Sequence, residues 1–555
     1  MAMEELRKLT QKRKDHIQSC KENNDKSHEI IAGLYSDPSH FVYELLQNAD
    51  DAGASEITFT LIHDCLEVSH NGKRLFNYDD IDSITTVGAS TKKNDINAIG
   101  KFGAGFKSVF GVTTSPIIHS GNYHFKIVDF IVPEAINPIE SDNNTIIILP
   151  FNHSDLSNEG AYQQVAEKLI TLESESLLFL RNIREIQWRT EEDKGHYLSD
   201  INSGKAYIVS QHNDKDQTKE YLLFKKTIDI EGAQLSLAVA YALTDCNNTL
   251  RIKPLHDTKL FVFFPTNERT GLKFIVHAPY KTTPSRESIP FSDAQNKILT
   301  KELSSLIANS LIKIKEQGYL DVDFLTMLPI DGTEDHPIYS SSFQQIKETL
   351  LSEKILPTSD GLFANAADAV LAREKELVVL LDTNDNSKLF GRANWLNANI
   401  TYNKTKALRD YLIKELNIHE VNMEQFCESI NEEFIKHKSD DWLIDFYSSI
   451  TTNKALYRVR TSYQQRGVLR EKPIIRLEDG NHIQPENDSG ELQVYLPTEQ
   501  ESEFNTVKRV IAENEKAIEF LKALGLKTPD SVSEIKEFIA PKYKERQSEL
   551  DKAQY

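Results

Sequence analysis

Two carboxylates and a carboxamide recur at helical spacing in the segment ELLQNADDA, which runs from Glu44 to Ala52. Glu44, Asn48 and Asp51 stand at positions i, i+4 and i+7, so a helix would present them as one polar stripe. The adjacent face has the apolar residues Val42, Leu45, Leu46 and Ala49. That face would seat the helix on a core. Such a stripe can hold a metal–phosphate group and orient a water molecule. Taken alone, however, the segment fits an ordinary amphipathic helix with a solvated polar face better.

Glycines are concentrated in a second segment, GKFGAGFKSVF. Gly100, Gly103 and Gly105 permit close backbone approach and positive φ, so main-chain amides can point at phosphate oxygens. The segment is not a P-loop, because Phe106 separates Gly105 from Lys107. It also lacks the third glycine of a dinucleotide-binding fingerprint at the required spacing. The segment thus matches neither of these two phosphate-binding motifs.

A β-hairpin is predicted between these segments, over residues 56 to 76. Apolar and polar residues alternate in it from Ile57 onward, which is the period of a half-buried strand. The hairpin ends in the turn pair Asn71-Gly72. After the glycine-rich loop a helix is expected to start at Ser108, and its N-terminus would also favour an anion.

The order of these segments resembles the Bergerat-fold ATPase superfamily of gyrase, heat-shock chaperone, histidine kinase and MutL (GHKL). In that family the first helix supplies a catalytic glutamate and a magnesium-binding asparagine, which Glu44 and Asn48 match. The stretch TTVGASTKK resembles the start of the family's mobile lid, with Lys92 as a phosphate contact. Thr145 resembles the threonine on the late strand beneath the adenine.

This resemblance implies ATP and Mg²⁺ as cofactors, with Glu44 catalytic and Asn48 as the metal ligand. The nucleotide-binding residues that it implies are Asn48, Asp51, His70, Asn71, Gly72, Lys92, Gly100, Phe102, Gly103, Ala104, Gly105, Phe106, Lys107 and Thr145.

One position departs from the family. The family has an aspartate two residues before the turn glycine, where it accepts the adenine amino proton, but here His70 precedes Gly72 by two residues. A neutral imidazole can accept one hydrogen bond, whereas an imidazolium cannot. With an ordinary pKa of about 6.5, His70 would lose this acceptor by about pH 5.5. Asn71 could supply a carbonyl instead if the register slips by one residue.

The chain has 555 residues and a formal net charge of −20, from 64 basic and 84 acidic side chains. This length predicts two to four domains. The charge makes direct nucleic-acid binding unlikely, because such a surface repels phosphates. The four cysteines form no CxxC or Cys/His cluster, so neither a zinc site nor a disulfide framework is expected. No apolar run or signal region is evident, so we expect a cytoplasmic protein without a membrane partner.

A second domain is predicted from strand-like runs after Leu222 and from a helix over residues 296 to 315. The segment KTTPSRESIP between them would by itself be a surface loop with a solvated arginine. In heat-shock chaperones of the superfamily, a Ser-Arg-Glu segment of the middle domain reaches the γ-phosphate, and Arg286 matches its arginine. Within the superfamily, the sequence is most similar to the sacsin-type branch, over roughly residues 25 to 320. Four segments carry this similarity: ELLQNADDA, SHNGKRLF, IGKFGAGFKSVF and FFPTNERTGLKFIVHAPY.

Beyond Tyr319 no catalytic constellation stands out. The same order of features occurs in residues 355 to 371 and in residues 474 to 496: an apolar run, then Asp-Gly, then a second apolar run. This order predicts two hairpin modules. Helices are expected over residues 405 to 450. An amphipathic helix over residues 507 to 525 would end in a glycine cap.

We therefore predict an α+β protein with three parts. A two-layer α/β sandwich (Bergerat ATP-binding fold, 1–155) precedes an α+β transducer domain (156–320) and a mixed C-terminal region of α+β modules (321–555). The expected function is that of a Mg-dependent, chaperone-like ATPase switch in which Glu44 and Arg286 are catalytic. Protein partners or clients are expected on the C-terminal region, and a homodimer is left open.

Three other interpretations of function are considered at this point. DNA-linked ATPases of the superfamily remain possible, although the net charge of −20 argues against direct binding to a duplex. A non-hydrolysing nucleotide-dependent scaffold would use the same binding residues. A histidine kinase is disfavoured, because no helical dimerisation segment with an acceptor histidine precedes the site. A role in prokaryotic antiviral defence is a guess from the resemblance alone.

Overall fold

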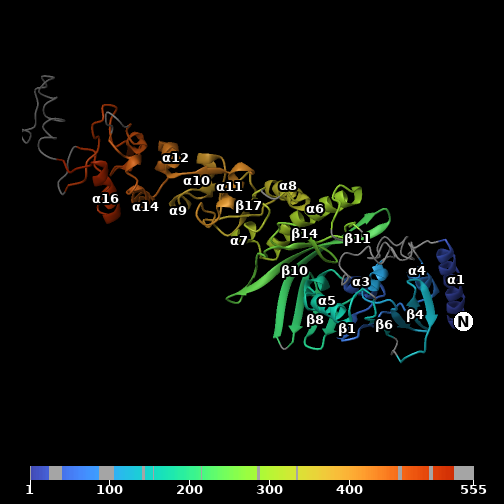
Figure 1. Cartoon of the computed structure of the whole chain (residues 1–555). Helices are drawn as coiled ribbons and strands as arrows, with labels where there is room; N and C mark the ends of the chain where they lie inside the picture. Colours follow the sequence, from blue (N-terminus) through green and yellow to red (C-terminus); the bar gives the residue numbers. More distant parts are fainter. Residues whose placement is uncertain are drawn as a thin grey trace, which may run out of the picture. The chain divides into compact units, whose positions relative to one another are not determined.

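The computed structural model divides the chain into two compact units, residues 1–349 and 350–555, and each is described by itself (Figure 1). The described residues are 2–23, 41–86, 105–140, 144–153, 155–213, 215–283, 288–332, 335–459, 465–498 and 504–529.

The first unit is built on one mixed sheet, which has fifteen strands among the described residues. Its first part consists of β1 (Glu56–Ile62), β2 (Cys65–His70), β3 (Ile117–Ser120), β4 (Tyr123–Val128), β5 (Val132–Ala135) and β6 (Thr145–Pro150). Their spatial order is β1-β2-β6-β3-β4-β5, and all of these pairs are antiparallel. The hairpin predicted after the first helix is β1–β2, in which Ile57 lies opposite His70.

The inner face of these strands is covered by helices. They are α3 (Phe41–Asp51), α4 (Tyr78–Ile84), the 3-10 helix η4 (Gly105–Gly111) and α5 (Asn158–Ile170). In α3 the apolar residues predicted for the core are fully or nearly fully buried, with Leu46 and Ala49 both 0% exposed. They join Phe59 and Val68 of the hairpin in a single core cluster. This layer of helices on a sheet confirms the predicted α+β class.

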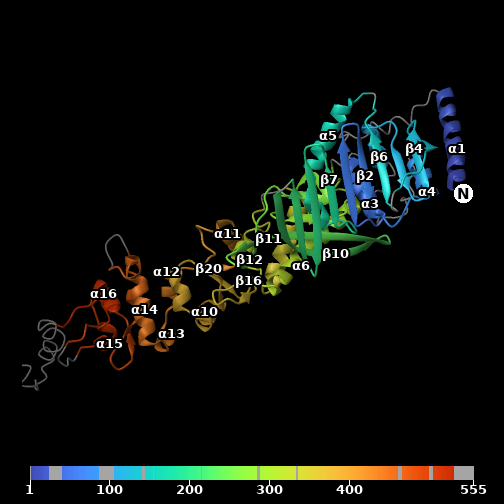
Figure 2. The same cartoon turned by 90° about the horizontal axis from the view of Figure 1, so that it is seen from below.

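The N-terminal helix α1 (Ala2–Glu22) lies along the β5 edge of the sheet (Figure 2). Leu6 and Leu9 bury its apolar stripe in the core cluster. Polar contacts fix it to two strands: Tyr123 Oη donates to Glu5 Oε2 over 2.9 Å, and Lys14 Nζ lies 2.9 Å from Glu134 Oε1. The edge of the sheet is therefore covered rather than open.

The sheet continues without a break beyond residue 155, because β1 pairs in parallel with β7 (Glu185–Arg189). The strands that follow are β8 (Lys194–Asn202), β9 (Lys205–His212), β10 (Lys215–Ile230), β11 (Ala233–Cys246), β12 (Thr249–Ile252), β13 (Lys259–Val262), β14 (Phe264–Arg269) and β15 (Ile275–His277). The core cluster of α3 extends to Trp188 and Tyr197. The first two predicted parts thus share a sheet and a core, and their boundary stays a prediction.

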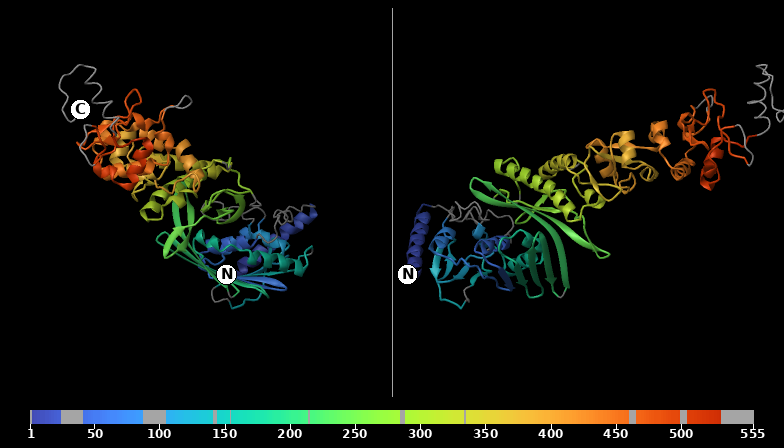
Figure 3. Two further views of the ribbon diagram at one scale, coloured as in Figure 1. Left: turned by 90° about the vertical axis from the view of Figure 1, so that its left-hand side faces the viewer. Right: turned by 180° about the vertical axis from the view of Figure 1, so that it is seen from behind.

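The predicted helix over residues 296 to 315 is α6 (Ala294–Glu316), which packs on β10 and β11 (Figure 3). Asp293 caps it by accepting from the amides of Gln295 and Asn296, at 2.8 and 3.3 Å. The other helices of this unit are η5 (Ser174–Leu178), α7 (Val322–Leu325) and most of α8 (Pro337–Ser352). Among the described helices of the whole chain, none combines the length and the apolarity needed to cross a membrane.

Both hairpins predicted for the second unit are present. β16 (Leu356–Pro357) pairs with β17 (Phe363–Ala364), and β21 (Ile475–Arg476) pairs with β22 (His482–Ile483). The Asp-Gly turns place Gly361 and Gly480 at φ of 82° and 88°, where glycine is favoured. The remaining strands are β18 (Ala369–Ala372), β19 (Asn394–Trp395) and β20 (His419–Val421).

The helices of the second unit begin at α9 (Glu376–Leu380). The others are α10 (Thr383–Phe390), α11 (Lys406–Lys414), α12 (Met423–Ser429), α13 (Glu432–Lys436), α14 (Asp440–Ile450), η6 (Lys454–Leu456), η7 (Val468–Glu471), α15 (Arg509–Ala512) and α16 (Glu515–Leu524). The prediction of a single helix over residues 507 to 525 is wrong, because two helices, α15 and α16, occupy this range. Asn514 interrupts it by accepting from the amides of Lys516 and Ala517, which starts α16 as a new helix. The predicted glycine cap is correct, with Gly525 at φ 104°.

Candidate functional site

Glu44 is turned into the protein rather than towards solvent. It lies on the first turns of α3, and only 3% of it is exposed. Asn48, one turn further along, and Asp51, at the end of the helix, are both partly exposed. A solvated polar face would leave the carboxylate open to water, so this burial contradicts the simpler interpretation of the motif. A buried carboxylate is the form that a general base usually takes.

Gly105, the first described residue of the glycine-rich segment, lies directly against this carboxylate. A Cβ atom added to Gly105 would lie 2.0 Å from Oε2 and 2.8 Å from Cδ of Glu44. Only a glycine allows this approach. The helix predicted to start at Ser108 begins instead at Gly105 and is a 3-10 helix, in which Ser108 Oγ donates to the Gly105 carbonyl over 2.6 Å. Its short length gives it little of the macrodipole expected from an α-helix.

Lys107 is a buried cation within the same 3-10 helix. It is 2% exposed, and its Nζ has no hydrogen-bond partner among the described residues. Burial, together with the nearby charge of Arg13, lowers the pKa of Lys107 to about 8. Arg13 itself is held by Asp82, with Nη2 2.6 Å from Oδ1 and 2.9 Å from the main-chain oxygen. Within the described part of the chain, the ammonium of Lys107 therefore has no hydrogen-bonded carboxylate, which a buried cation ordinarily needs.

His70 marks the opposite end of the site. It is the last residue of β2, only 6% exposed, and it pairs directly with Thr145 of β6. The Gly72 amide donates to His70 Nδ1 over 3.1 Å. Burial lowers the pKa of His70 to about 4. The ring is therefore neutral at pH 5.5, where the ordinary pKa had predicted a change of charge.

Thr145 is fully buried, and its Oγ1 lies 2.7 Å from Ser120 Oγ. Ser120 Oγ also accepts from the Phe76 amide over 3.1 Å. The side chains of His70 and Thr145 thus point from neighbouring strands to the same face of the sheet, towards the helices.

The two ends are joined by α3. Glu44 contacts Gly105 at the start of the helix, and Ala52 follows its end, where a Cβ on Gly72 would lie 2.9 Å from the Ala52 Cβ. Eight residues separate Glu44 from Ala52, which is about 12 Å along a helix axis. A carboxylate with a glycine loop and a buried histidine–threonine pair therefore stand at opposite ends of one helix. That spacing suits an extended ligand with an anionic end and a heterocyclic end.

Asn71, next to His70, has a structural role. Asn71 Oδ1 accepts from the amides of Ser55 and Glu56, at 2.9 and 3.2 Å, and Asn71 Nδ2 donates to Ser55 Oγ. These bonds tie the end of β2 to the start of β1. They occupy the carboxamide that was the alternative to His70 for contact with a base.

Asp50 has a structural role that the sequence analysis missed. Asp50 is 0% exposed, and its carboxylate accepts from the amides of Arg181, Asn182 and Ile183, at 3.1, 2.7 and 3.0 Å. It anchors α3 to the segment that leads into β7. Nothing in the local sequence signals this role, because its partners lie more than 130 positions away.

Six predicted site residues lie outside the described part of the chain: Lys92, Gly100, Phe102, Gly103, Ala104 and Arg286. Phe106 is 6% exposed and belongs to the core cluster, so its side chain supports the loop. The described residues contain no group of three or more His, Cys, Asp or Glu suited to a metal. A magnesium ion bound with a nucleotide needs no such group, because it takes one or two protein oxygens, phosphate oxygens and waters. The carboxamide oxygen of Asn48 fits that requirement.

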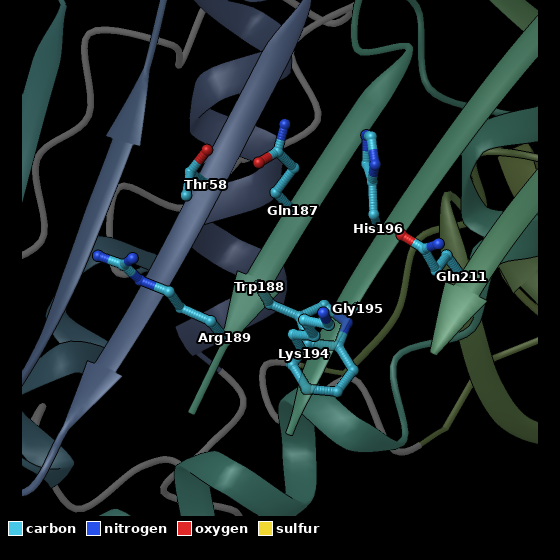
Figure 4. Close-up of a pocket in the computed structure, with 8 residues that line it drawn as sticks. All are labelled: Thr58, Gln187, Trp188, Arg189, Lys194, Gly195, His196 and Gln211. Carbon is cyan, nitrogen blue, oxygen red and sulfur yellow. The ribbon is translucent and has the colours of Figure 1, made fainter. Parts of the chain in front are cut away.

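A separate hollow of about 270 Å³ lies on the other face of the sheet (Figure 4). Thr58, Gln187, His196 and Gln211 stand side by side across β1, β7, β8 and β9. Glu185 ties two of them together, accepting from Gln187 over 2.6 Å and lying 2.8 Å from His196 Nε2. Thr58 points away from the buried face that Ile57 and Phe59 share with His70, so this hollow is distinct from the site along α3.

Comparison with known proteins finds a match to the Sacsin domain family over residues 27–147. The chain is 28% identical over 349 residues to Protein NO VEIN of Arabidopsis thaliana, covering 56% of this chain and 13% of that protein. It is 34% identical over 107 residues to human Sacsin, covering 16% of this chain and 2% of that protein. The chain thus spans only a small part of the length of these relatives.

The comparison with solved structures finds three partial matches. They are the N-terminal domain of a DNA repair protein (13% identity, TM-score 0.30, 46% of this chain and 88% of that chain), the gyrase B-subunit of Myxococcus xanthus (10%, 0.30, 56% and 93%) and the ATPase domain of MutL from Aquifex aeolicus (12%, 0.19, 32% and 72%). Because these TM-scores are low, we assign no property of these proteins to this chain.

Proposed function

We propose that this sacsin-type, GHKL-like protein binds a magnesium nucleoside triphosphate along α3 and hydrolyses it, with ATP the nucleotide expected from the family. The single observation that carries the proposal is the contact of Glu44 with Gly105 at one end of α3, with His70 and Thr145 at the other. Phosphates would lie at the first end and the base at the second.

Glu44 would act on the attacking water. Its carboxylate is held in a buried position, where charge interacts more strongly than in water, and its contact with Gly105 limits its orientation. The water would give its proton to this carboxylate as its oxygen bonds to the γ-phosphorus, while the bond from that phosphorus to the β–γ bridging oxygen breaks and the nucleoside diphosphate leaves. When bound, Mg²⁺ would neutralise charge on the phosphate oxygens.

The remaining groups would bind rather than react. Asn48 would hold the magnesium ion through its carboxamide oxygen, one helical turn from Glu44. Lys107 is a buried cation that lacks a hydrogen-bond partner among the described residues, and a triphosphate would supply the missing counter-charge. Arg286, which lies outside those residues, is proposed to complete the site in the full chain, as the resemblance to heat-shock chaperones of the superfamily implies.

The test compares Glu44→Gln, Asn48→Ala and wild type in ATP turnover and ATP affinity. Glu44→Gln retains the volume of the side chain but removes the base, so we expect turnover to fall by about 10²–10⁴-fold with an affinity within about twofold of wild type. Asn48→Ala should weaken binding of Mg-ATP much more than binding of ATP without Mg²⁺. The matched control is Glu67→Gln, an exposed carboxylate on β2, which should change neither.

Equal turnover in wild type and Glu44→Gln would reject the catalytic assignment. Binding of ATP without any turnover in the wild type would instead favour a non-hydrolysing scaffold. These measurements require the full chain. A fragment ending near Asn152 would lose β7, which pairs with β1, and α5, which packs in the same core. Magnesium dependence, a cytoplasmic location, partners on the second unit and an antiviral role stay predictions.

A further inference from the structure

The histidine at the proposed base end is fixed by its own turn. The Gly72 amide donates to Nδ1 of His70 over 3.1 Å, and a Cβ on Gly72 would lie 2.8 Å from that nitrogen. The turn glycine is therefore what lets the main chain approach the ring. The bond holds Nδ1 as an acceptor within the protein, so Nδ1 is not available to a ligand.

The tautomer follows from this bond. A neutral imidazole has one nitrogen with a proton and one without. Because Nδ1 accepts a hydrogen bond from an amide, the proton resides on Nε2. The lowered pKa of His70, about 4, keeps the ring in this neutral form at physiological pH. Towards a ligand His70 is thus a hydrogen-bond donor, the opposite of the aspartate whose place it takes.

The neighbouring Thr145 hydroxyl is not restricted to either donating or accepting a hydrogen bond. Ser120 Oγ accepts from the Phe76 amide and can either donate to Thr145 Oγ1 or accept from it. The Thr145 hydroxyl can therefore turn to meet a ring nitrogen with or without a proton. Of the pair formed by His70 and Thr145, His70 is therefore the residue whose hydrogen-bonding direction is fixed.

We infer that the site selects a purine with an oxygen at position 6, as in GTP or ITP, over the 6-amino purine of ATP. This inference rests on the proposed function, because it assumes that the base lies against His70 and Thr145. The Nε2 proton of His70 matches the O6 acceptor, whereas it opposes the amino protons of adenine. The adjacent N1 proton of a 6-oxopurine would be accepted by Thr145.

The experiment measures the dissociation constants of Mg-ATP, Mg-GTP and Mg-ITP for the full chain. ITP isolates the effect, because its base differs from that of ATP only at position 6 and in the N1 proton. We expect wild type to bind ITP and GTP at least about tenfold more tightly than ATP, since an opposed pair of donors leaves two buried groups unsatisfied. His70→Asp should reverse the ratio in favour of ATP.

His70→Asn is a second variant, which tests the inference even if His70→Asp fails to fold. Its carboxamide can present either an acceptor or a donor, so the ratio of the ITP and ATP constants should come within about twofold of unity. His63→Asp, in the turn between β1 and β2, is the matched control and should retain the wild-type ratio. Tighter binding of ATP than of ITP by wild type would overturn this inference and leave the proposed function standing. Absence of binding of all three nucleotides would overturn both.

Discussion

Gly105 and Glu44 are in contact across the start of α3, so closely that a methyl group on Gly105 would lie 2.0 Å from the Glu44 carboxylate oxygen. No real pair of such atoms approaches so closely, so any side chain at Gly105 must displace either the carboxylate or the loop. Glu44 is buried, and the loop leads into a core-packed 3-10 helix. The position of the proposed base is therefore set by a glycine from a segment sixty residues away in the chain.

Gly105→Ala should lower turnover about tenfold to a hundredfold by moving the Glu44 carboxylate, because a displacement of about 1 Å can cost as much as 10²-fold. The measurement is ATP turnover together with urea unfolding. In a Glu44→Ala background the same substitution should cost no further stability, since its steric partner has gone. Gly160→Ala, on the first turn of α5, is the matched control and should leave turnover unchanged. Wild-type turnover in Gly105→Ala would contradict the contact.

Local periodicity explains which features could be predicted. The helix α3, the hairpin β1–β2, the helix α6 and both Asp-Gly hairpins follow from patterns that repeat within a few residues. The long helix expected over 507 to 525 failed for a local reason of its own. The side chain of Asn514 competes for main-chain amides and starts a new helix there.

The sequence motifs could name candidate residues for the site, but they could not give the burial or the hydrogen bonding of those residues. The motifs named Glu44, His70 and Thr145 as candidates, but the burial of Glu44 and the bonding direction of His70 depend on tertiary neighbours. Asp50, to which the sequence analysis gave no role, shows the same limit. The partners of Asp50 come from the segment before β7, and no pattern near α3 points to them.

Asp50→Asn should destabilise the ligand-free protein by roughly 2–4 kcal/mol, because an amide nitrogen would replace one of the carboxylate oxygens that accept three main-chain N–H groups. Chemical denaturation measures this loss. Asp51→Asn is the neighbouring comparison, and there we expect a smaller loss of stability with a larger effect on nucleotide affinity. If both variants lost the same stability, the anchoring role of Asp50 would be wrong.

Lys107→Met should stabilise the ligand-free protein at pH 7 while weakening nucleotide binding. The substitution keeps an unbranched side chain but removes a buried charge without a hydrogen-bond partner among the described residues, a gain on the order of 1–3 kcal/mol. Lys73→Met, at an exposed position, is the control and should do neither. Added nucleotide should raise the melting temperature of wild type more than that of Lys107→Met, because the phosphates supply the counter-charge.

The pH dependence of stability in wild type and in Lys107→Met gives an independent check. In the folded chain the pKa of Lys107 is lowered to about 8 from the usual 10.5. Between these two pH values the unfolded chain binds more protons, so wild-type stability relative to Lys107→Met rises as pH rises. The advantage of the methionine variant should therefore be constant below pH 8 and shrink from pH 8 to 10.5. A stability difference independent of pH across this window would show that Lys107 is not a buried, uncompensated ammonium.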